Sequence, residues 1–174
     1  MPTPGGTVPV VNDSRCMQAA LAVAVAVTWA SASARADEST IKHPGVHPDY
    51  VSEAEPHALV APFDKFAPGV GFRGTVEIVD NGFIQRINNT VGIGFGVDWT
   101  EKHVRVPIVM QWNFWLSRNW SVFGEPGGAL RFKKKETKPE PAFFAGGRYH
   151  FSDVVTLTLR VGHPVASVGV SFLL

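Results

Sequence analysis

The strongest constraint on the fold is an alternation of apolar and polar residues with period two, which runs from about residue 57 to the C-terminus at residue 174. Successive side chains of a β-strand point to opposite faces, so this alternation predicts strands with one apolar and one polar face. Residues 104–116 give the clearest case, because every second residue from Val104 to Leu116 is apolar. No window of useful length has apolar residues at helical spacing, and the sequence therefore predicts an all-β protein.

Seven segments carry the alternation, and an eighth is limited by a proline. They are residues 70–79, 91–99, 104–116, 120–132, 143–151, 155–161 and 168–172, with 57–63 as the eighth. Most connections are short, which favours antiparallel hairpins between consecutive strands. The longer ones are residues 80–88 and the charged segment 133–141 (KKKETKPEP), which we expect to be loops. Closing such a sheet hides its edges, so we predict an antiparallel up-and-down meander closed as an eight-stranded β-barrel. The composition of its two faces further predicts a transmembrane β-barrel.

The alternation alone leaves open which face is the interior. A soluble barrel encloses its apolar face, whereas a membrane barrel turns that face toward lipid. The polar face favours the membrane barrel, because it carries arginines while every lysine after residue 36 falls in a predicted loop or before the barrel. Arginine suits a confined interior, since its planar guanidinium pairs with carboxylates through two hydrogen bonds. The predicted interior network consists of Arg73, Glu77, Asp98, Arg105, Glu125, Arg131, Arg148 and Arg160.

Glycine supports the same orientation. The segment NTVGIGFGVDW (residues 89–99) has glycine at positions 92, 94 and 96 of the polar face. The interior of an eight-stranded barrel is just wide enough to be filled by side chains. A strand without side chains on that face leaves room for the arginines and for Trp115. On a solvent face, each of these glycines would only cost about 0.5–1 kcal/mol of stability.

Large aromatic residues lie near the ends of several predicted strands, where transmembrane barrels carry aromatic girdles. Most of the predicted strands have about ten residues, which is enough to cross a bilayer at a tilt. The residues assigned to the lipid-facing surface and its girdles are Trp99, Trp112, Trp120, Phe151 and Phe172.

These strands, with GGRYHFSDVVTLTLRVG (residues 146–162) and the terminal VGVSFLL, resemble the small eight-stranded outer-membrane barrels of Gram-negative bacteria, which include the OmpA transmembrane domain, OmpX and OmpW. The resemblance covers residues 57–174 and lies in the pattern. It implies a structural or surface-interaction protein without catalysis or a cofactor. Its partners would be outer-membrane lipid, lipopolysaccharide and the outer-membrane assembly machinery. Barrels of this group usually end in an aromatic residue, whereas Phe172 is third from the end here.

The N-terminal region has the features of an export signal. Arg15 precedes an apolar run at residues 17–29, and Ala34-Arg35-Ala36 fits a cleavage site, so residues 1–36 are predicted to be a signal peptide. The one cysteine, Cys16, lies within it, which excludes an intramolecular disulfide and a cysteine metal site. Residues 37–56 are acidic and proline-rich, and we expect a flexible lead-in.

Three further sets of residues are candidate sites. His150 and Ser152 resemble the base and nucleophile of outer-membrane lipid A deacylases, although a hairpin turn with an interior histidine explains them more simply. Histidines 43, 47 and 57 lie in or next to a segment without cysteine, and we predict no metal site. Lysines 133–135 could contact anionic lipopolysaccharide.

The net charge of +1, without aromatic residues among clustered lysines and arginines, does not indicate a protein that binds nucleic acid. The main alternative to the membrane barrel is a soluble periplasmic barrel that binds an apolar ligand. In that case Phe72, Phe95, Phe114 and Leu157 would line an internal pocket rather than face lipid.

Overall fold

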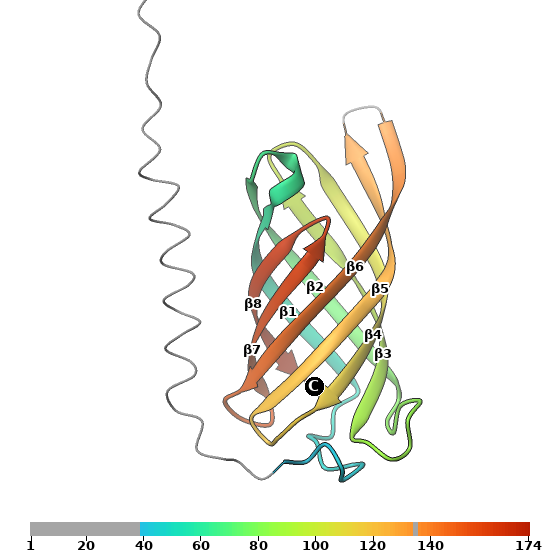
Figure 1. The fold of residues 1–174 in the computed structure, drawn as a ribbon. Coiled ribbons are helices and arrows are strands. Elements are labelled where there is room, and N and C mark those ends of the chain that lie inside the picture. Colours follow the sequence, from blue (N-terminus) through green and yellow to red (C-terminus); the bar gives the residue numbers. More distant parts are fainter. Residues whose placement is uncertain (1–38, 134–135) are drawn as a thin grey trace, which may run out of the picture. The chain divides into compact units, whose positions relative to one another are not determined.

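The fold is an eight-stranded antiparallel β-barrel, seen here in a computed structural model that describes residues 39–133 and 136–174. Each strand pairs with its neighbours in sequence, and β1 pairs with β8 to close the barrel (Figure 1). The predicted all-β meander is confirmed. The strands are β1 (Ser52–Ala61), β2 (Ala67–Val79), β3 (Asn89–Thr100), β4 (Val104–Trp115), β5 (Trp120–Lys133), β6 (Glu136–His150), β7 (Val155–His163) and β8 (Ala166–Leu173), with one short 3-10 turn, η2 (Pro62–Asp64).

The 3-10 turn η2 is the one helical element of the described residues. Within residues 39–133 and 136–174, no helix is long and apolar enough to cross a membrane. The predicted signal peptide, residues 1–36, lies outside the described residues.

The first strand begins earlier than the sequence predicts. β1 starts at Ser52, so the last five residues of the predicted lead-in are strand, and Pro62 lies just beyond its end. Glu53, Glu55 and His57 alternate with less buried residues and face the interior. Arginines of other strands pair with these two glutamates in the interior, and this pairing stabilises them there. The local composition of the segment does not reveal such partners.

The charged segment 133–141 is not the loop that we expected. Residue 133 ends β5 and residues 136–141 begin β6, and the two strands pair without a register shift from Trp120↔Tyr149 to Lys133↔Glu136. Figure 1 shows this hairpin extending beyond the other strands at the upper end. The charges and prolines of the segment are compatible with strand because this part of the hairpin lies beyond the apolar belt.

One edge of this hairpin is open. Among the described residues, β7 pairs with β6 only from Phe143 onward, which leaves residues 136–142 of β6 without a partner on that side. The amide of His150 donates to the carbonyl of Asn119, on the β5 side. Alternate amides point to opposite neighbours, so the odd-numbered residues of β6, including Pro139 and Pro141, direct their nitrogens toward the open edge.

Residues 39–51 lie across the opposite end of the barrel, the lower end in Figure 1. The amide of Thr40 donates to the carbonyl of Leu116 at 3.0 Å. The ring of His47 stacks on the inward-pointing Trp115, with centroids 5.4 Å apart. This segment therefore packs against the end of the barrel through specific contacts.

The apolar face of the strands is the outside of the barrel. Val70, Phe95 and Ile108 are each more than half exposed, at 63%, 51% and 57%. The residues that alternate with them are buried and include most of the charged side chains of the strands. The soluble-barrel alternative is wrong in this respect: the four residues of its proposed ligand pocket, Phe72, Phe95, Phe114 and Leu157, lie on the outward face.

The inward glycines are required by close packing. A Cβ atom on Gly96 would lie 2.3 Å from the carbonyl oxygen of Phe72, and one on Gly71 would lie 2.3 Å from Nε2 of His57. Gly124 points outward, and a Cβ atom there would meet nothing within 4 Å. The glycine-rich face of residues 89–99 thus provides interior space, as the sequence predicts.

Candidate functional site

The interior of the barrel holds two clusters of charged side chains. The first, here called the middle network, consists of Glu53, Glu55, His57, Arg73, Asp98, Glu125, Arg148 and Arg160. The second, here called the mouth network, lies at the end that carries the β1–β2 and β3–β4 connections and consists of Asp64, His103, Arg105, Arg131 and Glu140.

Glu125 is the centre of the middle network. Its Oε2 accepts hydrogen bonds from Nη1 of Arg73 at 3.1 Å and from Nε of Arg160 at 2.9 Å. Its Oε1 accepts from Nη2 of Arg160 at 3.1 Å and from the amide of Gln111 at 3.0 Å. One fully buried carboxylate therefore binds two guanidinium groups from strands on different sides of the barrel.

Two bidentate pairs extend the network. Arg160 donates to both oxygens of Glu55, at 2.6 and 3.0 Å. Nη2 of Arg148 lies 2.8 and 2.7 Å from the two oxygens of Glu53. The guanidinium groups of Arg148 and Arg160 also lie over the ring of Phe123, at 4.6 and 5.2 Å from its centroid. Charge-assisted hydrogen bonds and cation–π contacts thus act on the same arginines.

His57 lies between two carboxylates of the middle network. Its Nε2 is 2.9 Å from Oδ1 of Asp98, and its Nδ1 is 3.5 Å from Oε1 of Glu55. Glycine at positions 71 and 169 gives the ring its space, because a Cβ atom at either position would come within 2.8 Å of a His57 side-chain atom. The network has four carboxylates against three guanidinium groups, and the His57 ring lies between two of these carboxylates.

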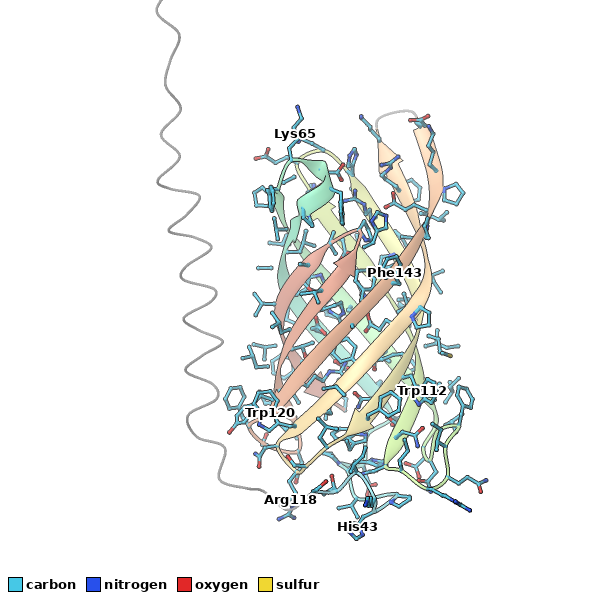
Figure 2. All side chains as sticks on the ribbon, in the orientation of Figure 1. His43, Lys65, Trp112, Arg118, Trp120 and Phe143 are labelled. Carbon is cyan, nitrogen blue, oxygen red and sulfur yellow. The ribbon has the colours of Figure 1, made fainter. Side chains whose placement is uncertain are left out.

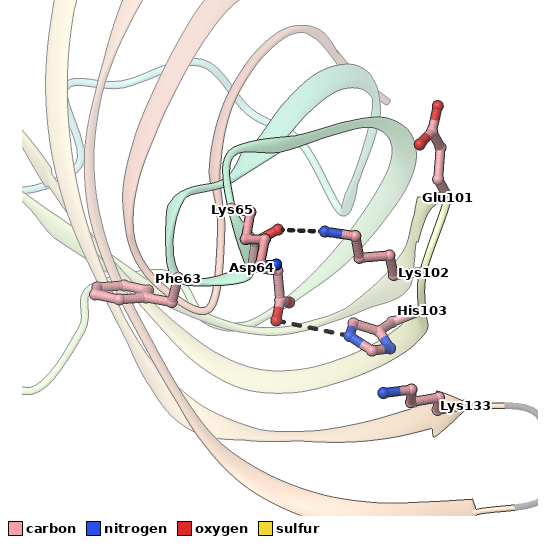
Figure 3. A pocket seen from close by; sticks show the side chains of 7 residues that line it. All are labelled: Phe63, Asp64, Lys65, Glu101, Lys102, His103 and Lys133. Atoms are coloured by element: carbon pink, nitrogen blue, oxygen red, sulfur yellow. Dashed lines mark hydrogen bonds and ion pairs between the residues drawn. The ribbon is translucent and has the colours of Figure 1, made fainter. Parts of the chain in front are cut away.

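The mouth network is built around Arg105. Its Nε donates to Oε1 of Glu140 at 2.8 Å, and its Nη2 donates to Asp64. Nε2 of His103 lies 3.6 Å from Oδ1 of Asp64, as Figure 3 shows, and Nε of Arg131 lies 3.6 Å from Glu140. Asp64 comes from the short η2 turn, which brings its carboxylate over the end of the barrel.

The mouth network alters the pKa of two of its members. Burial by itself would raise the pKa of Asp64, but the hydrogen bond and the charge of Arg105 outweigh it and hold that pKa below its usual value. Burial lowers the pKa of His103, and the positive charges of Arg105 and Arg131 lower it further against the opposing effect of Asp64.

An apolar layer lies between the two networks. On β4, the inward-facing Val109 lies between Arg105 of the mouth and Gln111, which contacts the middle network. On β5, Ala129 likewise lies between Arg131 and Glu125. These residues belong to one buried apolar cluster, made of Leu59, Ala61, Ala67, Val109, Ala129, Ala142, Phe144 and Val165.

The eight residues predicted for the interior network are found in three environments. Arg73, Asp98, Glu125, Arg148 and Arg160 belong to the middle network, while Arg105 and Arg131 belong to the mouth network. Glu77 faces inward near the opposite end, is only half-buried, and has no arginine partner among the residues that the structure describes. The sequence pattern therefore located the charged groups without showing that they form two separate clusters.

Several members of these networks lie outside the strands that the sequence predicts. Glu53 and Glu55 fall in the predicted lead-in, and Glu140 falls in the predicted loop. The period-two alternation of SEAEPHALVA, which places Glu53, Glu55 and His57 on one face, was the signal that could have identified the first two.

The predicted girdle residues all lie on the outward face or at its rim. Trp99, Phe151 and Phe172 are exposed, at 65%, 63% and 39%. Trp120 packs edge-on against Tyr149 with centroids 5.1 Å apart, and Trp112 donates a hydrogen bond to Asn89. Figure 2 shows Trp112 and Trp120 near the lower end of the barrel.

His150 and Ser152 have separate hydrogen-bond partners. His150 is buried, and its Nε2 lies 2.9 Å from the hydroxyl of Ser121. The exposed Ser152 hydroxyl instead accepts hydrogen bonds from the amides of Val154 and Val155 within the β6–β7 turn. No group of three or more His, Cys, Asp or Glu residues in the described part of the chain is arranged to hold a metal ion.

Comparison with known proteins bears on the fold. No protein-family model and no curated protein sequence matches the chain. A chain from the de novo design of transmembrane β-barrels aligns over 77% of this protein and 99% of its own length, with a TM-score of 0.57 and 12% identity. The chain has the fold of a transmembrane β-barrel. The outer membrane protein Ail of Yersinia pestis, determined in a phospholipid bilayer nanodisc, aligns over 72% of this protein and 100% of its own length, with a TM-score of 0.49 and 11% identity.

Proposed function

We propose that this protein is an integral outer-membrane β-barrel of a structural or surface-interaction type, with a closed interior and no catalytic activity. The observation that carries the proposal is the orientation of the strands, with apolar side chains outside and ion pairs inside. Soluble monomers rarely expose apolar patches of more than a few hundred square ångströms. An apolar belt that extends around a closed barrel is suited to lipid.

The interior supports a closed barrel rather than an open pore. Eight strands enclose a space that side chains can fill. A solute on its way through would have to pass the apolar layer and separate ion pairs such as Arg160–Glu55 and Arg73–Glu125, whose members are at most 1% exposed. Separating buried charge pairs without replacing their partners is costly.

The absence of catalysis is supported by the surroundings of the candidate residues. A nucleophile needs a base within hydrogen-bond reach and access to substrate. Ser152 has backbone amides as partners, while His150 and its partner Ser121 are both buried. Replacing Ser152 with alanine is expected to leave the lipid A of producing cells unchanged.

The arrangement of the ends suggests a topology and partners. The C-terminus lies at the same end as residues 39–51, so we assign that end to the periplasm and the mouth network to the cell surface. Outer-membrane lipid would surround the belt, and lipopolysaccharide would meet the lysines of the mouth. Assembly machinery would engage the last strand, β8, in which Phe172 lies on the outward face.

Membrane integration can be tested by heat modifiability. The full chain is produced in a Gram-negative host, the outer membrane is isolated, and its mobility on a denaturing gel is compared with and without boiling. We expect the protein in the outer-membrane fraction with a mobility that changes only on boiling. Recovery in the soluble periplasmic fraction would contradict the proposal.

Two variants test whether the outward face of the strands contacts lipid, because each adds one charge at an exposed position. Phe95→Arg places a charge on the outward face of β3, where exposure to lipid costs about 2–4 kcal/mol near the bilayer midplane. Val51→Arg places the same charge at an exposed position before β1. We expect only Phe95→Arg to reduce the heat-modifiable form; equal tolerance of both variants would indicate that the belt faces water.

A further inference from the structure

The mouth of the barrel contains an open cavity with an excess of positive charge. The cavity has a volume of about 520 Å³ and is lined by Phe63, Asp64, Lys65, Glu101, Lys102, His103 and Lys133 (Figure 3). Its three lysines come from three different parts of the chain: the β1–β2 connection, the β3–β4 connection and the end of β5. They therefore surround a common space instead of forming a run along one strand.

The lysines of this cavity are free to bind an anion. None of them makes an ion pair with a carboxylate of the residues described in the structure. The Asp64 carboxylate is already bound to Arg105, and Lys102 contacts only the backbone oxygen of Asp64, at 3.0 Å. With Asp64 neutralised by Arg105, the lining has three ammonium groups against the one carboxylate of Glu101.

Two buried polar atoms next to the cavity have no partner within the described chain. They are Nδ1 of His103, which lines the cavity, and Nη1 of Arg105, which belongs to the guanidinium group bound to Asp64. His103 and Arg105 are 6% and 2% exposed. Buried polar atoms normally have hydrogen-bond partners, so unpartnered ones beside a polar cavity indicate that water or a ligand completes them.

The backbone holds Lys65 in place. Lys65 and Phe66 both have positive φ angles, 60° and 53°, which are uncommon for residues with a Cβ atom. The preceding Asp64 is fixed by Arg105 and by the contact of its backbone oxygen with Lys102. Unusual backbone conformations of this kind persist where surrounding contacts fix them, often at binding sites.

We propose that this cavity binds a phosphate group, with Lys65, Lys102 and Lys133 as its charged ligands and His103 on its wall. A phosphate has several acceptor oxygens in different directions and carries up to two negative charges, which suits a cavity lined by lysines from three parts of the chain. The group could be carried by lipopolysaccharide, an assignment that rests on the proposed outer-membrane location, or it could be free phosphate. Both sources present the same chemistry to the site.

The test uses the full-length chain, processed in its host, purified in a zwitterionic detergent and studied by NMR. Inorganic phosphate is titrated at constant ionic strength against chloride, and the backbone amides of residues 101–103 and the ring of His103 are followed. We expect saturable shifts in the wild type. In the double variant Lys65→Gln/Lys133→Gln, the dissociation constant is expected to rise at least tenfold.

Lys42→Gln is the matched control, because it removes one exposed lysine at the opposite end of the barrel. We expect its dissociation constant to match that of the wild type. Equal weakening in Lys42→Gln and the double variant would show non-specific charge attraction and overturn the proposal. Absence of saturation in the wild type would also overturn it.

A second arm identifies the source of the phosphate. The protein is placed in nanodiscs of phosphatidylcholine with or without lipopolysaccharide. Shifts of residues 101–103 that appear with lipopolysaccharide and are lost in the double variant would assign the lipid-borne group. Phosphate binding in detergent without an effect of lipopolysaccharide would assign the free anion. Phosphate binding by a protein absent from the outer membrane would keep the site and contradict only the proposed location.

Discussion

The middle and mouth networks contain the same kind of ion pair, but they differ in their exposure to solvent. Every charged side chain of the middle network is at most 1% exposed. In the mouth network, the side chains of Asp64, Glu140 and Arg131 are 21%, 13% and 30% exposed. Water can replace a lost partner at the mouth but not in the middle. Every charged group of the middle network therefore needs a partner within the protein. Charged groups of the mouth network can instead be completed by water or by a ligand.

The largest effect is expected when the middle network loses its central carboxylate. Glu125→Gln keeps the shape of the side chain but leaves Arg73 and Arg160 without the charge that both contact. Removing one partner of a buried pair typically costs about 3–5 kcal/mol. We expect a loss of this size in the free energy of unfolding, measured by urea titration of the protein in lipid vesicles.

The matched control for this prediction is Glu140→Gln, which makes the same chemical change in the mouth network. Because Glu140 is partly exposed, we expect a loss of about 1 kcal/mol or less. Equal losses in the two variants would remove the distinction between the networks.

A smaller effect is expected from filling the space around His57. Gly71→Val places a side chain against the His57 ring and the backbone oxygen of Val97, at positions where even a Cβ atom comes within 2.7 Å. Overpacking of this kind typically costs about 1–3 kcal/mol. Gly124→Val adds the same atoms on the outward face, where space is open, and should leave the urea midpoint unchanged or raise it. A tolerated Gly71→Val would show that the middle network can rearrange.

The smallest effect is expected at the mouth, and it should depend on pH. Arg105 holds the pKa of folded Asp64 below its unfolded value near 4, so the contribution of Asp64 is fully present above pH 4 and is lost as the pH falls through the folded pKa. Asp64→Asn removes this contribution, which we expect to be below about 1 kcal/mol at neutral pH. Between pH 5 and 2, the wild type should therefore lose more unfolding free energy than the variant. Parallel curves would contradict the assignment.

The sequence predicted the strands because alternation is a local property of the backbone. It predicted charged positions such as Arg73 and Arg160 for the same reason. It predicted the orientation of the strands because the polar face carries arginine and glycine. It could not predict which carboxylate each arginine contacts, since Arg160 meets Glu55 from 105 positions away. Pairing across a barrel depends on strand order and register, which no short stretch of sequence encodes.

The composition of two segments wrongly predicted that they are not strands. SEAEP, at the beginning of β1, and ETKPEP, at the beginning of β6, have the charges and prolines of connecting segments. They are strands because their neighbours supply hydrogen bonds and because their charges face an ion-paired interior or lie beyond the apolar belt.

The two prolines at the open edge of β6 limit what can pair with that edge. An exposed strand edge is a template on which another chain can add a strand. Along residues 136–142, the amides that would face an incoming strand are those of residues 137, 139 and 141, and two of these positions are Pro139 and Pro141, which have no N–H to donate. Among these three positions only Thr137 has an N–H to donate, so this edge is a poor template for the addition of another strand.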